Sequence, residues 1–284
     1  MVLFICGKRI KYKEKAYNET ARMRRKTGML IVFNKFKIFS YIVSLTTVII
    51  LFAMAFMMTS PEKTIETSAS TKALPIYNVA REEKKVAFTM NCAWGAEDID
   101  SILDTLSKYK VQITFFIVGD FAEKYPDAVK KIADEGHEIG NHSDTHPHVN
   151  NLSLEKNIEE IQECSKKIES ITGKKTTLYR GPYGEYNDTV IQAAESQGHT
   201  AIQWSIDTLD YSGLIGEQMW SRIKEKLAPG SIILSHNGTK HTADSLDMLL
   251  HQIIEENGYQ VVTVSNLLYK ENYMIDSNGT QRNV

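Results

Sequence analysis

The sequence predicts an α/β fold built on a parallel β-sheet, and three observations point to it. Between residues 85 and 270, short apolar, β-branched runs alternate with amphipathic stretches. Seven such units follow one another, which is typical of a parallel sheet, either open or closed into a barrel. With 42% hydrophobic and 24% charged residues and 6 prolines, the 284-residue chain has the composition of a packed globular protein.

The expected strands are short and bounded by turns. Each is rich in apolar or β-branched side chains, as buried strands are. They cover residues 86–90, 112–118, 137–140, 177–180, 200–204, 231–235 and 260–264. In a parallel sheet, the active site is expected at the carboxyl ends of these strands.

Four amphipathic helices are expected between the strands. Residues 97–108 place four apolar side chains on one face, and residues 153–171 do the same before a stop at Gly173. A third helix starts at a cap formed by Asn187 or Asp188 and ends at Gly198. The fourth, over 243–257, ends at Gly258, a usual left-handed cap.

The amino-terminal part of the chain has the pattern of a membrane anchor. Residues 1–58 hold eleven Lys or Arg against two Glu, a balance of +9, so the remainder sums to −11 within the total of −2. Residues 38–58 are 21 residues without a charge, long enough as a helix to cross a hydrocarbon layer of about 30 Å. Because the basic residues precede this segment, residues 1–37 are expected in the cytoplasm and the chain after Thr59 outside, in a single-pass protein of the cell membrane.

A cleaved signal peptide is the alternative to an anchor, and it would give a secreted protein. Ala53-Met54-Ala55 resembles a small-x-small cleavage site, and Met23 precedes three basic residues. A buried core helix is less compatible with the sequence, because core helices rarely stay apolar on every side for five turns. Residues 59–84, rich in Thr, Ser, Lys and Glu, are expected to form an exposed linker before a domain over 85–270 and a tail over 271–284.

Cysteine usage and charge exclude two classes of function. Cys6, Cys92 and Cys164 are too few and too scattered for a disulfide framework or a Cys-x-x-Cys metal site. The balance of −11 after residue 58 gives nucleic acid no electrostatic attraction, so no nucleic-acid partner is expected.

Polar and titratable side chains gather at the expected carboxyl ends of five strands. They are Asn91 and Cys92 after the first, His142 to His146 after the third, Arg180 to Gly184 after the fourth, Asp207 and Asp210 after the fifth, and His236 after the sixth. A functional site needs such residues at these positions, whereas a core does not.

Each of these residues has a structural as well as a functional interpretation. His142 and His146, four residues apart, can chelate a cation of the zinc type, but they can also be surface or capping histidines. Arg180, at a strand end before a Gly-Pro turn, can orient a carboxylate or a substrate oxygen. Asp207 can instead cap a helix, and His236 can be a satisfied core histidine.

The order of the motifs is more specific than any one of them. Four motifs follow one another along the chain: His142-Ser143-Asp144-Thr145-His146, Arg180-Gly181-Pro182-Tyr183-Gly184, Asp207-Thr208-Leu209-Asp210-Tyr211 and Leu234-Ser235-His236. Over about residues 85–268 the chain thereby resembles the polysaccharide deacetylases, the NodB-homology group also called carbohydrate esterase family four. The resemblance implies a distorted (β/α) barrel.

The resemblance also implies a metal-dependent removal of acetyl groups from N-acetylated glycans, such as peptidoglycan or a chitin-like polymer. His142 and His146 would bind the metal, commonly Zn²⁺, which would polarise the acetamide carbonyl and activate a water. The backbone N–H of Tyr183 would help to hold the oxyanion. Tyr211, where the family has Trp, would keep an aromatic wall.

The remaining family roles fall on three side chains of this sequence. His236 would protonate the departing amine, and Asp207 would hydrogen-bond to it and keep it cationic near neutrality. Arg180 would brace the catalytic base.

The first motif departs from the family. Where the family has Thr-Phe-Asp-Asp, this chain has Thr89-Met90-Asn91-Cys92. Asn91 cannot accept a proton as the first Asp does, and general-base catalysis is typically worth about 10²–10⁴-fold. Cys92 replaces the second, metal-binding Asp; a thiolate is a good zinc ligand, but a free cysteine is also commonly a small buried hydrophobic residue.

Two functions remain open from the sequence. One is an active, membrane-anchored de-N-acetylase, because the other motifs are intact and a metal-bound water of pKa near about 7 is already partly hydroxide. The other is a pseudo-enzyme that binds glycan without turnover, because Asn91 leaves Arg180 without its expected partner. Retention of Asp207 and His236 favours the active enzyme.

Overall fold

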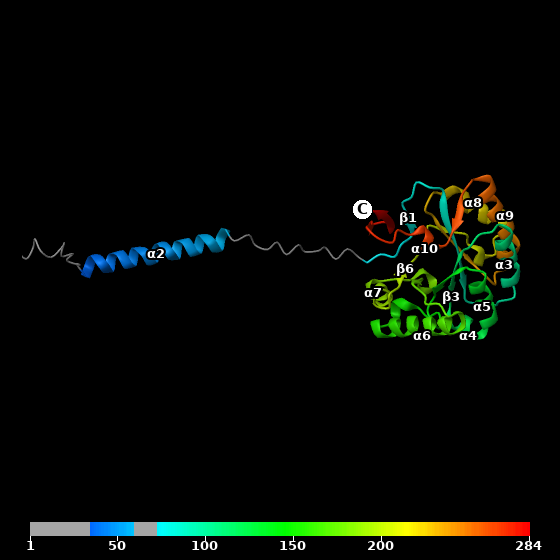
Figure 1. The fold of residues 1–284 in the computed structure, drawn as a ribbon, viewed down its shortest axis with the longest axis horizontal. Coiled ribbons are helices and arrows are strands. Elements are labelled where there is room, and N and C mark those ends of the chain that lie inside the picture. The colour runs from blue at the N-terminus through cyan, green and yellow to red at the C-terminus, as the bar shows by residue number, and fades with distance from the viewer. Residues whose placement is uncertain (1–34, 60–72) are drawn as a thin grey trace, which may run out of the picture. The chain divides into compact units, whose positions relative to one another are not determined.

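The computed structural model describes residues 35–59 and 73–284 of a chain that divides into two units, Met1–Ala69 and Ser70–Val284. In the first unit, helix α2 spans Lys35–Thr59 and contains the segment 38–58 that the sequence predicts to cross a membrane (Figure 1). Its described side chains, Phe39 and Leu45 among them, are exposed. Among the residues whose side chains the structure also describes, which do not include 53–59 of α2, no helix is long and apolar enough to span a membrane.

The second unit is built on a parallel sheet that curls into half a barrel. Seven strands lie in the order β6-β5-β4-β3-β2-β8-β7, and β9 pairs with the start of β2. All of these pairs are parallel. The strands are β2 (Lys85–Cys92), β3 (Thr114–Ile117), β4 (Glu138–Asn141), β5 (Leu178–Tyr179), β6 (Thr200–Ala201), β7 (Ile206–Asp207), β8 (Ile232–His236) and β9 (Gln260–Val262). The predicted parallel α/β sheet is confirmed, and β7 is the strand of this sheet that the sequence patterns did not predict.

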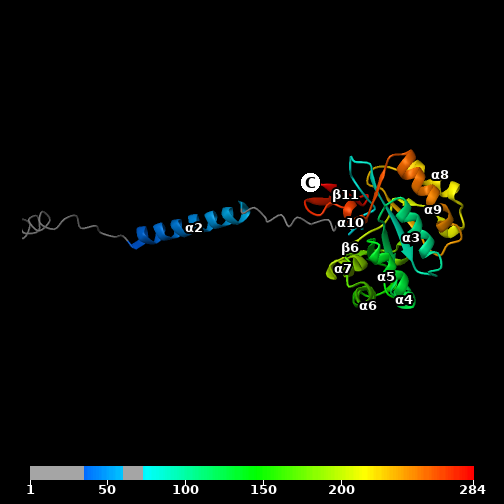
Figure 2. The same cartoon turned by 45° about the vertical axis from the view of Figure 1, so that its right-hand side comes forward.

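Helices follow most of the strands and cover the outer face of the sheet. They are α3 (Ile99–Lys108), α4 (Gly119–Lys124), α5 (Pro126–Asp134), α6 (Leu154–Thr172), α7 (Asp188–Ser196), α8 (Gly216–Lys226), α9 (Thr242–His251) and α10 (Val264–Leu267). Two views show α3, α8 and α9 gathered on one side and α4 to α7 on another (Figures 1 and 2). Helix α6 begins and ends as predicted, because the Ser153 side chain accepts from the Lys156 N–H and Gly173 closes the helix at φ 69°.

The two faces of β2 separate the outer core from the site. Val86, Phe88, Met90 and Cys92 belong to the large cluster that packs against the helices. Because side chains alternate along a strand, the intervening residues point to the other face. Asn91 is the last of these before the strand ends.

The folded unit extends beyond the predicted limits at both ends. Ile76 is fully buried and forms a bridge with Ile202, so the described end of the predicted linker, over 73–84, takes part in the fold, whereas residues 60–72 lie outside the described residues. A separate small sheet joins β1 (Asn78–Val79) to the predicted tail over 271–284, which forms β10 (Tyr273–Ile275) and β11 (Thr280–Asn283). Pairing between the two ends of the unit explains the difference, because neither short segment shows apolar periodicity by itself.

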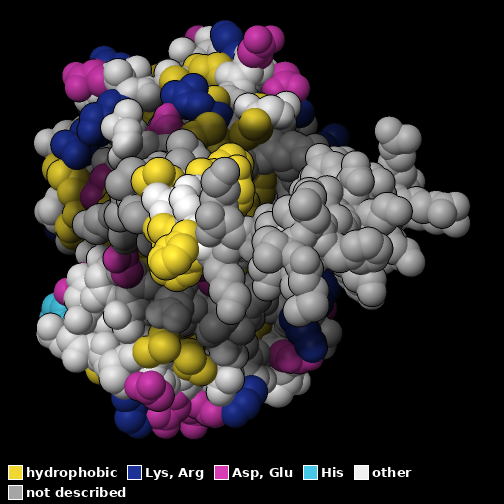
Figure 3. All heavy atoms as spheres, turned by 90° about the vertical axis from the view of Figure 1, so that its left-hand side faces the viewer, with side chains coloured by type: hydrophobic (Ala, Val, Ile, Leu, Met, Phe, Trp, Pro, Cys, Tyr) yellow, Lys and Arg dark blue, Asp and Glu magenta, His cyan; other side chains and the backbone are white. Residues whose placement is uncertain are grey.

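Side chains of both charges lie on the surface of the folded unit. On the face in Figure 3, basic and acidic side chains lie close to one another. Ion pairs such as Lys130–Asp134 and Lys131–Asp100 link exposed partners, and exposed pairs contribute little stability. The stability of the unit therefore depends mainly on its core.

Replacing Gly230 by Ala is expected to lower the free energy of unfolding by about 3 kcal/mol. Gly230 has φ 83°, and an added Cβ would lie 1.6 Å from the carbonyl oxygen of Val79. Gly173 is the matched control, because it has φ 69° with no atom within 4 Å of an added Cβ, so Gly173→Ala should cost about 1 kcal/mol. Urea unfolding of both variants measures the difference, and equal losses would contradict a close contact at Gly230.

Candidate active site

A pocket of about 300 Å³ lies at the carboxyl ends of the central strands. Its lining brings together motif residues that are far apart in the chain: Asn91, His142, His146, Tyr183, Tyr211 and His236. Trp94, Trp204 and Leu234 complete most of the wall. The prediction that the site forms at this edge of the sheet is consistent with the position of the pocket.

His236 is held by Asp210, and not by Asp207 as the sequence analysis expected. Asp210 Oδ1 lies 2.9 Å from His236 Nδ1, and Asp210 Oδ2 accepts from the His236 backbone N–H at 2.6 Å. The Thr242 hydroxyl also donates to Oδ2, at 2.7 Å. Asp210 is fully buried, so its carboxylate has these donors in place of water.

The turn between β7 and β8 explains the exchange of roles. Leu209 adopts a left-handed backbone conformation at φ 54°, which turns the chain so that the Asp210 carboxylate contacts His236. Asp207 instead accepts from the Leu209 backbone N–H at 2.8 Å and from the Tyr211 hydroxyl at 3.1 Å. Asp207 thus shapes the loop and holds Tyr211, which forms part of the pocket wall.

Arg180 is fully buried behind Asn91. Its guanidinium donates to the Thr89 hydroxyl and to Asn91 Oδ1, both at 2.9 Å, and to the Gln203 carbonyl at 3.1 Å. All three acceptors are uncharged, and burial lowers the pKa of Arg180 to about 9. The Phe116 ring lies 4.0 Å from the guanidinium carbon and stabilises the cation.

Asn91 and His142 are joined directly. Asn91 Nδ2 lies 3.2 Å from His142 Nε2, and His142 Nδ1 lies 2.6 Å from the Arg180 backbone carbonyl oxygen. His146 is half-buried, and its ring meets the His142 ring edge-on at 5.0 Å. Burial first, and then the neighbouring His146, lower the pKa of His142 well below its usual value, so the imidazole is neutral near neutral pH.

Aromatic rings form the open side of the pocket. Trp94, Tyr183 and Tyr211 are each at least half exposed. The Trp94 ring lies 5.5 Å from the His236 ring at a tilt of 34°, and the Tyr211 ring meets His236 edge-on at 5.3 Å. Exposed rings beside polar groups suit a ligand with both apolar faces and hydroxyl groups.

Backbone strain gathers in the same loops. Ser143, His146, Tyr183 and Leu209 all have φ between 54° and 63° although none is glycine. Such conformations cost of order 1–3 kcal/mol each and persist where the surroundings fix them. The loops after β4, β5 and β7 are therefore shaped for the site more than for local stability.

A family model for polysaccharide deacetylase matches residues 78–202. The peptidoglycan-N-acetylglucosamine deacetylase of Bacillus cereus is 32% identical over 187 residues, which cover 64% of this chain and 68% of that protein. The chain belongs to the polysaccharide deacetylase family. Protein YlxY of Bacillus subtilis, named as uncharacterized, is 34% identical over 194 residues and is matched over 60% of its length, less than two thirds.

A solved structure of another polysaccharide deacetylase relative is informative for the site. BA3943 of Bacillus anthracis, named as a pseudoenzyme of carbohydrate esterase family four, is 31% identical with a TM-score of 0.65. The match covers 74% of this chain and 70% of that one. A mutant of BA3943 is named as having restored enzymatic activity, with the same identity and TM-score.

The side chains that line this pocket do not form a ligand set for a catalytic metal ion. His142 Nε2 already faces the Asn91 amide, so its lone pair is engaged. Across the described residues, no group of three or more His, Cys, Asp or Glu side chains is arranged to hold a metal. A catalytic zinc site uses three protein ligands and one open position.

Cys92 lies on the opposite face of β2 from Asn91, so its side chain is not placed to bind a metal in the pocket. It is fully buried in the outer core with Phe88 and Met90 and does not line the pocket. Burial, and to a smaller degree Asp98, raises the pKa of the Cys92 thiol well above its usual value, which disfavours the thiolate. The structure thus favours the interpretation of Cys92 as a small core residue.

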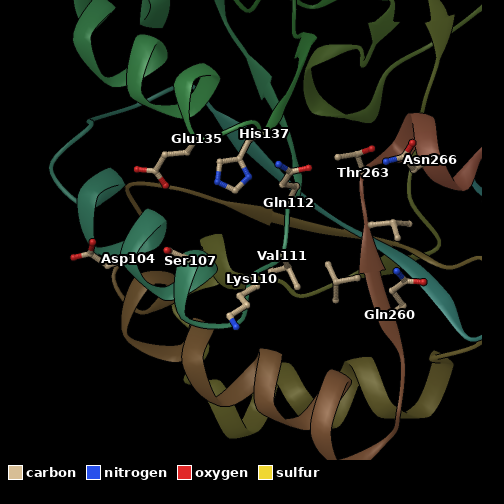
Figure 4. Close-up of a pocket in the computed structure, with 12 residues that line it drawn as sticks. Asp104, Ser107, Lys110, Val111, Gln112, Glu135, His137, Gln260, Thr263 and Asn266 are labelled. Atoms are coloured by element: carbon tan, nitrogen blue, oxygen red, sulfur yellow. The ribbon is translucent and has the colours of Figure 1, made fainter.

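His137 illustrates why nearness in sequence does not place a residue in the site. It precedes β4, whereas His142 follows β4, so the two lie at opposite ends of the strand. His137 lines a cavity of about 590 Å³ together with Gln112, Glu135 and Thr263 (Figure 4). Its Nδ1 accepts from the Ile113 backbone N–H at 3.2 Å, and burial lowers its pKa to about 4.

Other residues of the site lie outside the motifs from which it was predicted. Trp94 and Trp204 line the pocket, and Gln203 accepts from Arg180 through its carbonyl oxygen. Trp94 comes two residues after Cys92, at the end of the first predicted strand, and this position could have placed it in the site. Nothing in the local pattern distinguishes Gln203, because it contributes a backbone atom.

Proposed function

We propose that the domain binds N-acetylated glycan strands of the cell wall, with peptidoglycan as the polymer, and that its own deacetylation is very slow. The observation that carries the proposal is Asn91, an amide between Arg180 and His142 where hydrolysis needs a base. Relatives named as peptidoglycan deacetylases support the choice of polymer, and the pseudoenzyme BA3943 supports the loss of turnover.

The test of this function is a comparison of binding and turnover on the same glycan. We expect oligomers of N-acetylglucosamine, or peptidoglycan fragments, to bind the full chain with a measurable Kd by calorimetry. Acetate release should be no faster than that of a His236→Ala variant. Absence of glycan binding would contradict the proposal, and so would wild-type acetate release well above the His236→Ala variant.

Replacing Trp94 by Ala should weaken glycan binding by about 10-fold, because the ring forms an exposed wall of the pocket. Tyr273→Ala is the matched control, since Tyr273 is also a partly exposed aromatic residue but lies in β10, outside the pocket. Calorimetric titration with the same oligomer compares the two variants. Equal effects would mean that the glycan binds elsewhere.

An active de-N-acetylase is the second candidate, and the Asp210–His236 pair favours it. A binding domain has no need for a buried carboxylate that orients a histidine at 2.9 Å. The same acetate assay decides between the candidates, because an active enzyme would release acetate at a rate that His236→Ala abolishes.

We also propose that residues 38–58 anchor the protein in the cell membrane, with the glycan-binding domain outside. The 21 uncharged residues and the basic residues before them support this placement. The protein should then stay in the membrane fraction after a high-salt wash, and protease added outside intact cells should remove the domain. Release into the medium would instead support a cleaved signal peptide.

A further inference from the structure

Three hydrogen bonds join Arg180, Asn91 and His142 in a closed ring. The guanidinium donates to Asn91 Oδ1 at 2.9 Å, Asn91 Nδ2 faces His142 Nε2 at 3.2 Å, and His142 Nδ1 faces the Arg180 carbonyl oxygen at 2.6 Å. All three side chains are buried, with 5% or less of their surface exposed. Each contact therefore constrains the others without competition from water.

The proton positions in this ring follow from the two fixed partners. A carbonyl oxygen can only accept, so His142 Nδ1 carries the hydrogen. In a neutral imidazole, Nε2 then has a free lone pair, and the only partner in the ring that can donate to it is the Asn91 amide. A metal ion bound by His142 would need the same lone pair of Nε2.

Arg180 fixes which way the Asn91 amide points. A guanidinium only donates, so the amide oxygen faces Arg180 and the NH₂ group faces His142. Turning the amide over would bring two donors together at Arg180 and two acceptors together at His142. One orientation satisfies the whole ring, and it is the one that covers Nε2.

A carboxylate at position 91 could not do the same. It has no hydrogen to donate when ionised, so His142 Nε2 would be left without a donor and open to a cation. The amide supplies that donor from within the protein.

We infer that the Asn91 amide takes the place of a metal ion at His142, so that the pocket is complete without one. Asn91 thus removes the base and also blocks the nitrogen that a metal would bind. The blocking role does not depend on the glycan-binding function, because it concerns metal affinity alone.

The test separates blocking from the loss of a carboxylate ligand. Zn²⁺ is titrated by calorimetry into the full chain as wild type, Asn91→Ala and Asn91→Asp, each with His142→Ala added as its control. Asn91→Ala removes the amide without adding a ligand, so blocking predicts a zinc affinity about 10-fold above wild type that His142→Ala abolishes. Affinity in Asn91→Ala equal to or below wild type, with a gain in Asn91→Asp alone, would overturn the inference.

A second measurement does not depend on any variant folding. Long-range ¹H–¹⁵N spectra of the wild-type chain should show His142 protonated at Nδ1 and unprotonated at Nε2, and added zinc should not shift Nε2. A proton on Nε2, or a zinc-induced shift at a concentration near that of the protein, would refute blocking by Asn91.

Discussion

Replacing Asn91 by Asp is expected to raise acetate release from N-acetylated glycan by about 100-fold or more over the wild-type chain. The position already has what a catalytic carboxylate needs from the protein. Arg180 lies 2.9 Å from the side-chain oxygen of residue 91, and Asn91 itself lines the pocket. The new carboxylate would gain a buried cation as a partner, where the present acceptors of Arg180 are all neutral.

The measurement is acetate released per enzyme from a chitooligosaccharide, with and without added zinc. Adding His236→Ala to Asn91→Asp should return the rate to the wild-type background, because His236 is the residue expected to protonate the leaving amine. Asn91→Leu, similar in size but unable to accept a proton, is the matched control and should show no gain. An unchanged rate in Asn91→Asp would show that the pocket has been rebuilt beyond a single substitution.

The fold of the central domain could be predicted from local patterns. The run 86–90 lies within β2 and the run 231–235 overlaps β8 except at its first residue, because buried parallel strands need short apolar segments bounded by turns. The two ends of the unit could not be predicted in this way. The β1 strand has two residues, and its partner β11 is about 200 residues further along the chain, so no local pattern records their pairing.

The site was predicted as a set of residues but not as a set of contacts. His142, Arg180 and His236 meet at one edge because each lies at or directly after the carboxyl end of a strand of the same parallel sheet. The choice between Asp207 and Asp210 depends on the left-handed turn at Leu209 and on Thr242, which lies 32 positions beyond Asp210. A spacing of three residues at the end of a strand does not show which of the two carboxylates contacts His236.

The position of Cys92 on the core face of β2 could have been predicted from the alternation of side chains along the strand. Phe88 and Met90 are large apolar residues, and Cys92 continues their series at a period of two. Asn91 belongs to the opposite series. A metal ligand at position 92 would therefore need the strand to end before it, whereas β2 runs through Cys92.

Replacing Asp210 by Ala is expected to lower the free energy of unfolding by about 3 kcal/mol, whereas Asp207→Ala should cost less than about 1 kcal/mol. Asp210 is fully buried and accepts from the backbone N–H groups of His236 and Tyr211, from the His236 ring and from the Thr242 hydroxyl. Without the carboxylate, these donors are left in the core with no acceptor. Asp207 is half-buried, so water can replace it for its loop partners.

The two variants form a matched pair, since both residues are aspartates and they lie three positions apart at the end of β7. Urea unfolding of the full chain measures stability, and acetate release in an Asn91→Asp background measures the effect on His236. We expect Asp210→Asn in that background to lose most of the gained activity, because an amide can accept from only one of the two His236 donors without opposing its own NH₂ to the other. Asp207→Asn should keep most of it. Equal losses from the two aspartates, in stability or in activity, would show that Asp210 is not the residue that orients His236.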